Sequence, residues 1–142
     1  MATGELRRPS RRHRRRIDEA VRQAEQTTGL QFCVVLGVPA DRDPHEQAEA
    51  LFSTAIPEGR PAVLVLVAPK HHHVEVLTAP AARQRVSDAA AEVAVGIMVD
   101  AFAQGDLTLG LIAGIEHLAA SAGPGTAPTG QADIANIVDA ED

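Results

Sequence analysis

Aromatic side chains are almost absent from this chain of 142 residues, which has three phenylalanines and neither tyrosine nor tryptophan. Proteins that bind single-stranded nucleic acid or carbohydrate stack the ligand on such rings, so the sequence argues against that kind of binding. The hydrophobic fraction is nevertheless an ordinary 45%. A packed core must therefore be built from alanine, valine, leucine and isoleucine.

The chain also lacks a second cysteine, so Cys33 cannot form a disulfide within the chain. Cys33 lies in an apolar stretch, where a cysteine usually acts as a small hydrophobic side chain, and no neighbouring base marks it as a nucleophile. No hydrophobic run approaches the roughly 18 to 20 residues that span a bilayer, and the positive start is not followed by the apolar region of a secretory signal. We therefore expect a cytoplasmic protein with one domain.

Positive charge is scarce except at the start of the chain. Residues 1–16 contain seven arginines and one acid, which gives +6, while the whole chain carries −6, so the rest of the chain carries −12. A basic arm on an acidic body is suited to nucleic acid or an anionic membrane surface. We favour the plainer interpretation, in which the arginines form a solvated helix start or lie against the chain's own acidic surface. The anion-binding candidates are Arg11, Arg12, Arg14 and Arg15.

The longest apolar runs predict a sheet. Val63–Val67 has no polar alternation, which is typical of a strand buried on both faces. An earlier strand is expected at Leu30–Leu36, and a helix that begins after Asp43 separates the two, so the strands should be parallel. The turn Pro69–His72 leads into an antiparallel third strand, Val74–Thr78. We therefore expect an α/β fold, with a mixed sheet and helices on both faces.

Helical spacing and caps predict the remaining helices. Ser10 caps a helix over about 11–28, and a long helix is expected at about 81–103, with Val93 among its inward residues. Asp106 caps the last helix.

The end of the chain has a different composition. Glycine, proline and threonine dominate from residue 122 onward, which indicates a linker and a tail. Ile134, Ile137 and Val138 recur at helical spacing there and indicate a short docking turn at most. We expect a flexible basic N-terminus over 1–10, an α/β domain over 11–121 and a disordered acidic tail over 122–142.

Several segments resemble the TPM domain family, over about residues 4–121. They are TTGLQFCVVLG, AVLVLVAP, VEVLTAP and AFAQGDLTLGLIAGIEHL, in that order, and the step Gly105-Asp106-Leu107 followed by Gly110 is the most specific. The closest resemblance is to a small cytosolic TPM-like group of unknown function from high-GC bacteria. It implies a TPM-like mixed sheet with helices on both faces.

The resemblance also implies chemistry. TPM domains have been linked to divalent-cation binding and to acid phosphatase activity, often in membrane-anchored or thylakoid proteins. Asp88 and Asp106 match acidic positions of the family. The glycine-rich segment that usually follows the third strand is replaced here by residues 78–83, and this departure counts against a phosphatase site.

Topology brings further candidate ligands together. Parallel strands end at one edge of the sheet, where ligands of open α/β folds usually bind. The loop after the first strand holds Asp41, the turn after the second holds His71–His73, and the long helix returns Asp100 and Asp106 toward the same edge. Carboxylates favour Ca²⁺ or Mg²⁺, and added imidazoles favour Zn²⁺. The candidate metal ligands are Asp41, His71, His73, Asp88 and Asp106.

Plainer roles are available to most of these residues. Asp106 is explained as a helix cap, Asp88 complements the dipole of a helix start, and adjacent histidines in a turn point in different directions. We therefore expect a non-catalytic domain that binds a partner or a divalent cation, Ca²⁺ or Mg²⁺ before Zn²⁺. The alternatives are a divalent-metal-dependent acid phosphatase and a nucleic-acid or membrane-surface adaptor that uses the arginines.

Overall fold

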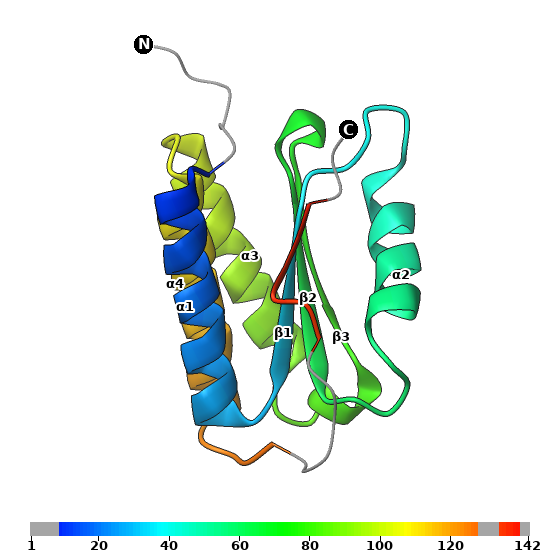
Figure 1. Cartoon of the computed structure of the whole chain (residues 1–142), viewed down its shortest axis with the longest axis vertical. Helices are drawn as coiled ribbons and strands as arrows, with labels where there is room; N and C mark the ends of the chain where they lie inside the picture. Colours follow the sequence, from blue (N-terminus) through cyan, green and yellow to red (C-terminus); the bar gives the residue numbers. More distant parts are fainter. Residues whose placement is uncertain (1–8, 128–133, 140–142) are drawn as a thin grey trace.

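Within residues 9–127 and 134–139, which the computed structural model describes, four α-helices and four strands form three layers. The mixed sheet has the order β3-β2-β1-β4, with α2 on one face and α1, α3 and α4 on the other (Figure 1). The expected α/β fold with helices on both faces is therefore confirmed. The elements are α1 (Arg11–Thr28), β1 (Gln31–Leu36), α2 (Pro44–Ala55), β2 (Ala62–Ala68), β3 (His73–Thr78), α3 (Asp88–Ala103), α4 (Leu107–Ala122) and β4 (Ile137–Asp139), with short 3₁₀ turns at Pro69–His71 and Pro80–Ala82.

Strand β2 is an interior strand of the sheet, and all of its residues are buried. Its side chains alternate, so Val63, Val65 and Val67 join the core beneath α1, α3 and α4, whereas Leu64 and Leu66 join the core beneath α2. It runs parallel to β1 and antiparallel to β3. The apolar run and the turn after it predicted both pairings.

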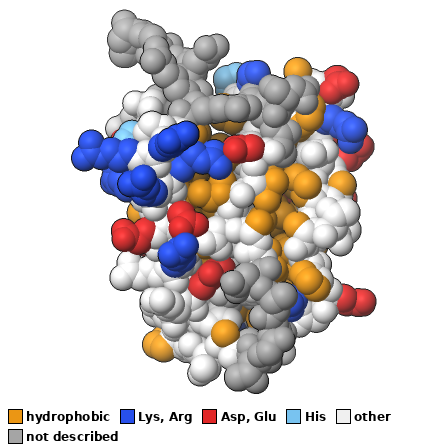
Figure 2. All heavy atoms as spheres, viewed as in Figure 1, with side chains coloured by type: hydrophobic (Ala, Val, Ile, Leu, Met, Phe, Trp, Pro, Cys, Tyr) orange, Lys and Arg blue, Asp and Glu red, His pale blue; other side chains and the backbone are white. Residues whose placement is uncertain are grey.

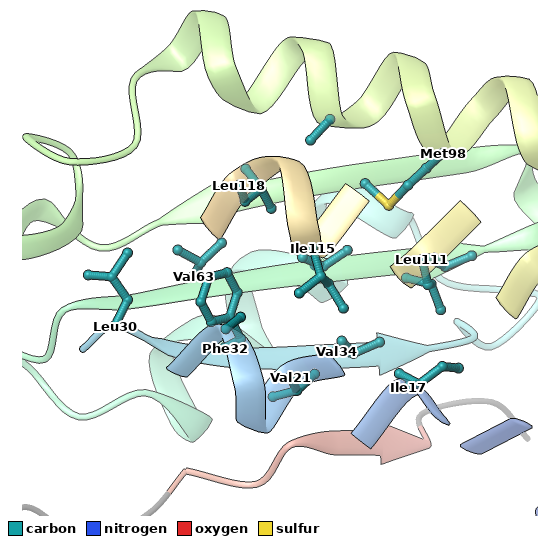
Figure 3. Packing of buried hydrophobic residues seen from close by; sticks show 14 of the residues in the cluster. Ile17, Val21, Leu30, Phe32, Val34, Val63, Met98, Leu111, Ile115 and Leu118 are labelled. Carbon is teal, nitrogen blue, oxygen red and sulfur yellow. The ribbon is translucent and has the colours of Figure 1, made fainter. Parts of the chain in front are cut away.

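The larger core lies between the sheet and three helices. Figure 3 shows Phe32 and Val34 of β1 packed among Val21 of α1, Ile115 of α4 and Met98 of α3. All five side chains are fully buried. Aliphatic side chains thus form most of this layer, with Phe32 as its fully buried ring, in line with the composition.

Two glycines allow α4 to pack closely on α3. Gly110 and Gly114 lie one helical turn apart on α4. A Cβ added to Gly110 would lie 2.8 Å from the Cβ of Ala101, and one added to Gly114 would lie 2.7 Å from Cγ of Met98. A larger residue at Gly110 would therefore push the two helices apart, and one at Gly114 would displace the side chain of Met98.

The long helix begins later than the expected start at residue 81. Residues Pro80–Ala82 form a separate 3₁₀ turn, and α3 begins at Asp88. The reason is a local cap: the side chain of Ser87 accepts a hydrogen bond from the backbone N–H of Ala90, at 3.1 Å. The starting point of the helix is set by this serine rather than by the apolar residues before it.

The residues of α3 that face the core also differ from those expected. Val93 was expected to point inward, but its side chain is 50% exposed. Ala94 and Met98, one turn apart, are the buried residues of the helix. The spacing of the large apolar residues was misleading here because a small alanine occupies the core position.

The end of the chain forms a strand and not the short docking turn that its helical spacing allowed. Residues Ile137–Asp139 form β4, which pairs parallel to β1 at the edge of the sheet. Ile137 packs against the core under α1 and Val138 against the core under α2. Adjacent residues thus cover opposite faces, as in a strand, and β1 supplies the hydrogen-bonding partner that sequence spacing could not reveal. Residues 1–8, 128–133 and 140–142, which belong to the expected flexible ends, lie outside the described residues.

Arg85 holds the chain where it leaves α4. Its guanidinium donates to the carbonyl oxygen of Thr28 at 2.6 Å and to that of Gly123 at 2.7 Å, with longer bonds to those of Ala122 and Pro124. A cation at the carboxyl ends of α1 and α4 also complements both helix dipoles. Arg85 therefore fixes the backbone at residues 122–124, where the tail begins.

Candidate functional site

The first turns of α1 carry an unusual concentration of positive charge. Five of its first six residues are arginine, and the first turn contains no acid. Cations at a helix N-terminus oppose the helix dipole, which costs stability. Ser10 caps the helix by accepting a hydrogen bond from the N–H of His13, at 3.2 Å. The arginines are therefore not explained by the needs of the helix.

A groove lies between this part of α1 and strand β4. Its volume is about 720 Å³. Four of its lining residues are arginine and two are acidic, so its walls carry an excess of positive charge. Figure 2 shows the basic side chains gathered over α1, next to an apolar area of the same face. The lining residues are Arg11, Arg14, Arg15, Asp18, Arg22, Glu25, Ile134, Asn136 and Ile137.

The tail of the chain forms one wall of this groove and is held to α1 by polar contacts. Nη1 of Arg14 lies 2.9 Å from Oδ2 and 3.0 Å from Oδ1 of Asp139. The side-chain amide of Asn136 donates to Oδ1 of Asp18 at 2.8 Å, and Arg22 pairs with the same carboxylate. Arg14 thus contacts the chain's own acidic residue, as one of our two interpretations expects.

The outer edge of β1 is covered in two parts. The backbone N–H of Phe32 donates to a carboxylate oxygen of Glu25 at 3.0 Å. Further along, the N–H of Val34 donates to the carbonyl of Asn136 at 2.8 Å, where the pairing with β4 begins. The side chain of Glu25 and the backbone of the tail therefore each bind part of the outer edge of β1.

The expected metal ligands are only partly brought together. Figure 1 shows the loop after β1, the β2–β3 hairpin and the α3–α4 turn at one end of the molecule. Nε2 of His71 lies 3.1 Å from the carbonyl oxygen of Pro39, so the histidine turn touches the loop that holds Asp41. Asp88 lies at the far end, because the 16 residues of α3 separate it from Asp106 by about 24 Å.

Asp106 caps α4 by accepting a hydrogen bond from the N–H of Leu109, at 2.9 Å. Asp88 lies in the first turn of α3, where a carboxylate complements the helix dipole. Across 9–127 and 134–139, no group of three or more histidine, cysteine, aspartate or glutamate residues has an arrangement that could hold a metal ion. The metal set therefore remains a hypothesis.

A different cluster joins α2 to β3, and sequence reasoning missed it. Glu75 accepts from both His45, with Nδ1 at 2.5 Å, and His73, with Nε2 at 2.8 Å. Nε2 of His45 also lies 3.4 Å from Glu49. Alternation along a strand places His73 and Glu75 on one face, and this signal could have identified the pair. The position of His45 required the packing of α2 on β3.

The hydrogen bond to Glu75 and the charge of Glu75 raise the pKa of His45 above its ordinary value of 6.5, with smaller contributions from Glu49 and Asp43. A raised folded-state pKa means that the ion pair contributes fully to stability below about pH 6.5 and loses its contribution as the pH rises through the folded-state pKa. A double-mutant cycle with His45→Gln and Glu75→Gln should therefore show a larger coupling at about pH 6 than at about pH 9. Urea unfolding measures it, and equal coupling at both values would contradict the ion pair.

Cys33 is buried in the core beneath α2. Burial, and to a smaller extent the charge of Glu25, raises the pKa of its thiol to about 11. The thiolate, which is the nucleophilic form, is therefore scarce at neutral pH. Cys33 acts as a small core residue, as its setting in the sequence predicted.

The fold defines a small mixed-sheet α/β domain. By sequence, the chain belongs to the family described as Domain of unknown function (DUF5130), whose model matches residues 6–119. It is 31% identical over 109 residues to the uncharacterised protein Rv2468c of Mycobacterium tuberculosis strain H37Rv, and equally to MT2543 of strain CDC 1551. The match covers 77% of this chain but 64% of each of these curated relatives, so the chain spans less than two thirds of their length.

Solved structures share the fold. The BA42 protein of Bizionia argentinensis superposes with a TM-score of 0.76 at 21% identity, covering 92% of this chain and 94% of that one. The N-terminal domain of cg2496 from Corynebacterium glutamicum gives 0.66 at 15% identity, with 88% and 84% covered. At these identities the likeness concerns the fold alone. Among the described residues, no helix has the length and apolar character needed to cross a membrane.

Proposed function

We propose that this chain is a non-catalytic binding domain whose arginine-lined groove takes an acidic segment of a protein partner. The contact between Arg14 and Asp139 carries the proposal, because it pairs an arginine of the groove with a carboxylate on an extended backbone segment. Arg11 and Arg15 line the same groove. Its four arginines outnumber the acids Asp18, Glu25 and Asp139 by one, so an excess of positive charge remains. The cost of clustering cations at the start of a helix is offset when an anion binds there.

A protein segment is favoured over nucleic acid for two reasons. Aromatic residues make up only 2% of the chain, so surfaces on which bases could stack are scarce. The groove also lies beside extended backbone, which suits a peptide.

Two pairs of arginines on α1 make a matched test. Arg11→Gln with Arg15→Gln removes charge from the groove, while Arg12→Gln with Arg16→Gln removes equal charge from residues that do not line it. Poly-L-glutamate binding, followed by fluorescence anisotropy at low salt, should weaken about five- to tenfold in the groove pair and little in the control pair. Equal losses in both pairs would show that only net charge matters.

The same variants test the adaptor hypothesis. Duplex DNA and phosphatidylserine vesicles are titrated in parallel with poly-L-glutamate at several salt concentrations. Tighter binding to DNA or vesicles, with a steep salt dependence and equal contributions from all four arginines, would overturn the proposal in favour of a nucleic-acid or membrane-surface adaptor.

Divalent-cation binding, which the TPM resemblance implies, is kept as a second proposal. The contact of His71 with Pro39 favours it, since this contact joins the histidine turn to the loop of Asp41. If the two loops share an ion, Zn²⁺, Ca²⁺ or Mg²⁺ should shift NMR signals of both together and raise the melting temperature, and Asp41→Asn should weaken the effect. Hydrolysis of a generic phosphomonoester with each ion tests the acid phosphatase alternative. A cytoplasmic location is part of the proposal.

A further inference from the structure

Strand β4 lies beyond the part of the chain that the family model matches. The family match covers residues 6–119, and β4 begins at Ile137. The intervening sequence is rich in glycine, proline and threonine. The strand itself has three residues and pairs with three positions of β1, whereas β1 pairs with β2 over six. The outermost strand of the sheet is therefore joined to β1 by a short ladder.

The tail is seated as a bound extended peptide would be. Its backbone accepts a hydrogen bond from the N–H of Val34, and the register pairs Val34 with Ile137 and Leu36 with Asp139. Ile137 and Val138 pack on opposite faces of the sheet, and Ile134 is only 6% exposed. Main-chain pairing with alternate side chains in separate pockets is the pattern by which sheet edges bind peptides.

Side chains of α1 recognise the polar residues of the tail. Asp18 accepts from the amide of Asn136, and Arg14 pairs with the carboxylate of Asp139. These two contacts lie on either side of the apolar pair Ile137 and Val138. The edge of β1 and the groove of α1 thus select a short pattern: an amide, two aliphatic residues and an acid.

We propose that the outer edge of β1 beside α1 is an acceptor site for an extended peptide of a protein partner, which carries two adjacent aliphatic residues followed by an acid. The chain's own Ile137–Asp139 segment occupies this site and competes with the partner. The inference rests on the proposed function, since the partner's acid meets the same arginines. The inference adds that the partner binds as an extended peptide. It also adds that the tail must leave the edge of β1 before the partner can bind.

The competition has a predictable size. A tethered segment has an effective concentration on the order of millimolar, so a free peptide at about 0.1 mM competes at a roughly tenfold disadvantage. Substitutions in the tail that weaken its contacts with β1 and α1, while β1 and α1 stay unchanged, should remove this disadvantage.

The test uses the full chain. A fluorescent peptide with the sequence of residues 132–142 is titrated against the wild type and against an Ile137→Asn, Asp139→Asn variant, in which the acceptor residues are unchanged. The peptide should bind the variant at least about tenfold more tightly than the wild type. Binding of equal strength to both proteins, or to neither, would overturn the inference. A peptide with asparagine in place of the acid is the matched control and should bind more weakly.

A second measurement needs no variant. If the tail leaves on its own, the amide of Val34, which donates to Asn136, should exchange through a smaller opening than the amide of Val65 in the middle of the sheet. Equal protection of both amides in native-state hydrogen exchange would mean that the tail leaves only on global unfolding. If the peptide fails but poly-L-glutamate still distinguishes the two arginine pairs, the inference falls while the proposed function stands.

Discussion

Replacement of Val65 by aspartate should prevent the chain from folding. Val65 is fully buried, and it is paired with Val34 on one side and Val76 on the other. A carboxylate at this position would be buried between the sheet and the helices α1, α3 and α4 without a partner, which costs several kcal/mol. The total stability of a domain of this size is about 5–15 kcal/mol, so little or none would remain. Far-UV circular dichroism and the dispersion of amide NMR signals measure the outcome.

Val93 offers the control for this substitution. The same change from valine to aspartate at Val93 falls on an exposed part of α3, so its effect on unfolding should stay within about 0.5–1 kcal/mol. A folded Val65→Asp variant with a native NMR spectrum would contradict the packing described for β2.

Gly110→Val should destabilise the fold by about 3 kcal/mol, at the upper end of the range for overpacked cores. The added Cβ would lie 2.8 Å from both the Cβ of Ala101 and a ring carbon of Phe102, and the Ala101 atom is fixed to its backbone. The two helices must then separate, which exposes part of the core. Urea unfolding should show a lower midpoint with an unchanged slope.

Gly96→Val is the matched control on the neighbouring helix. A Cβ at Gly96 meets no atom within 4 Å, and valine has a somewhat higher helix propensity than glycine. Its stability should be unchanged or slightly higher. A similar loss of stability in both variants would contradict the idea that Gly110 is required for the close approach of α4 to α3.

Much of the fold follows from short-range patterns. The unbroken apolar run of β2 requires cover on both faces, and the caps at Ser10, Asp43 and Asp106 mark three helix starts that the structure confirms. Val93 shows where such patterns fail, because a buried alanine next to it gives no hydrophobic signal. Local sequence thus indicates elements well and the orientation of a uniformly apolar helix poorly.

The groove and the histidine cluster could not be predicted in the same way. The arginines of α1 were visible in the sequence, but the groove forms only when a strand lies beside them at the edge of β1, as β4 does. Nothing within the tail indicates that its partner is β1, since a three-residue strand has no pattern of its own. Glu75 likewise meets His45 only through the packing of α2 on β3. Contacts between distant segments depend on tertiary structure, which spacing along the chain does not encode.

The four carbonyl groups held by Arg85 set the range over which a released tail can act. Since the guanidinium binds the backbone as far as Pro124, only the residues beyond that point would be freed with β4. Fully extended, the residues from 125 to Ile137, where β4 begins, span at most about 45 Å. After detachment, β4 would stay within that distance of Arg85, which binds the backbone where α1 and α4 end. A released β4 could therefore pair with the sheet edge of another protein only if that edge lay within this distance.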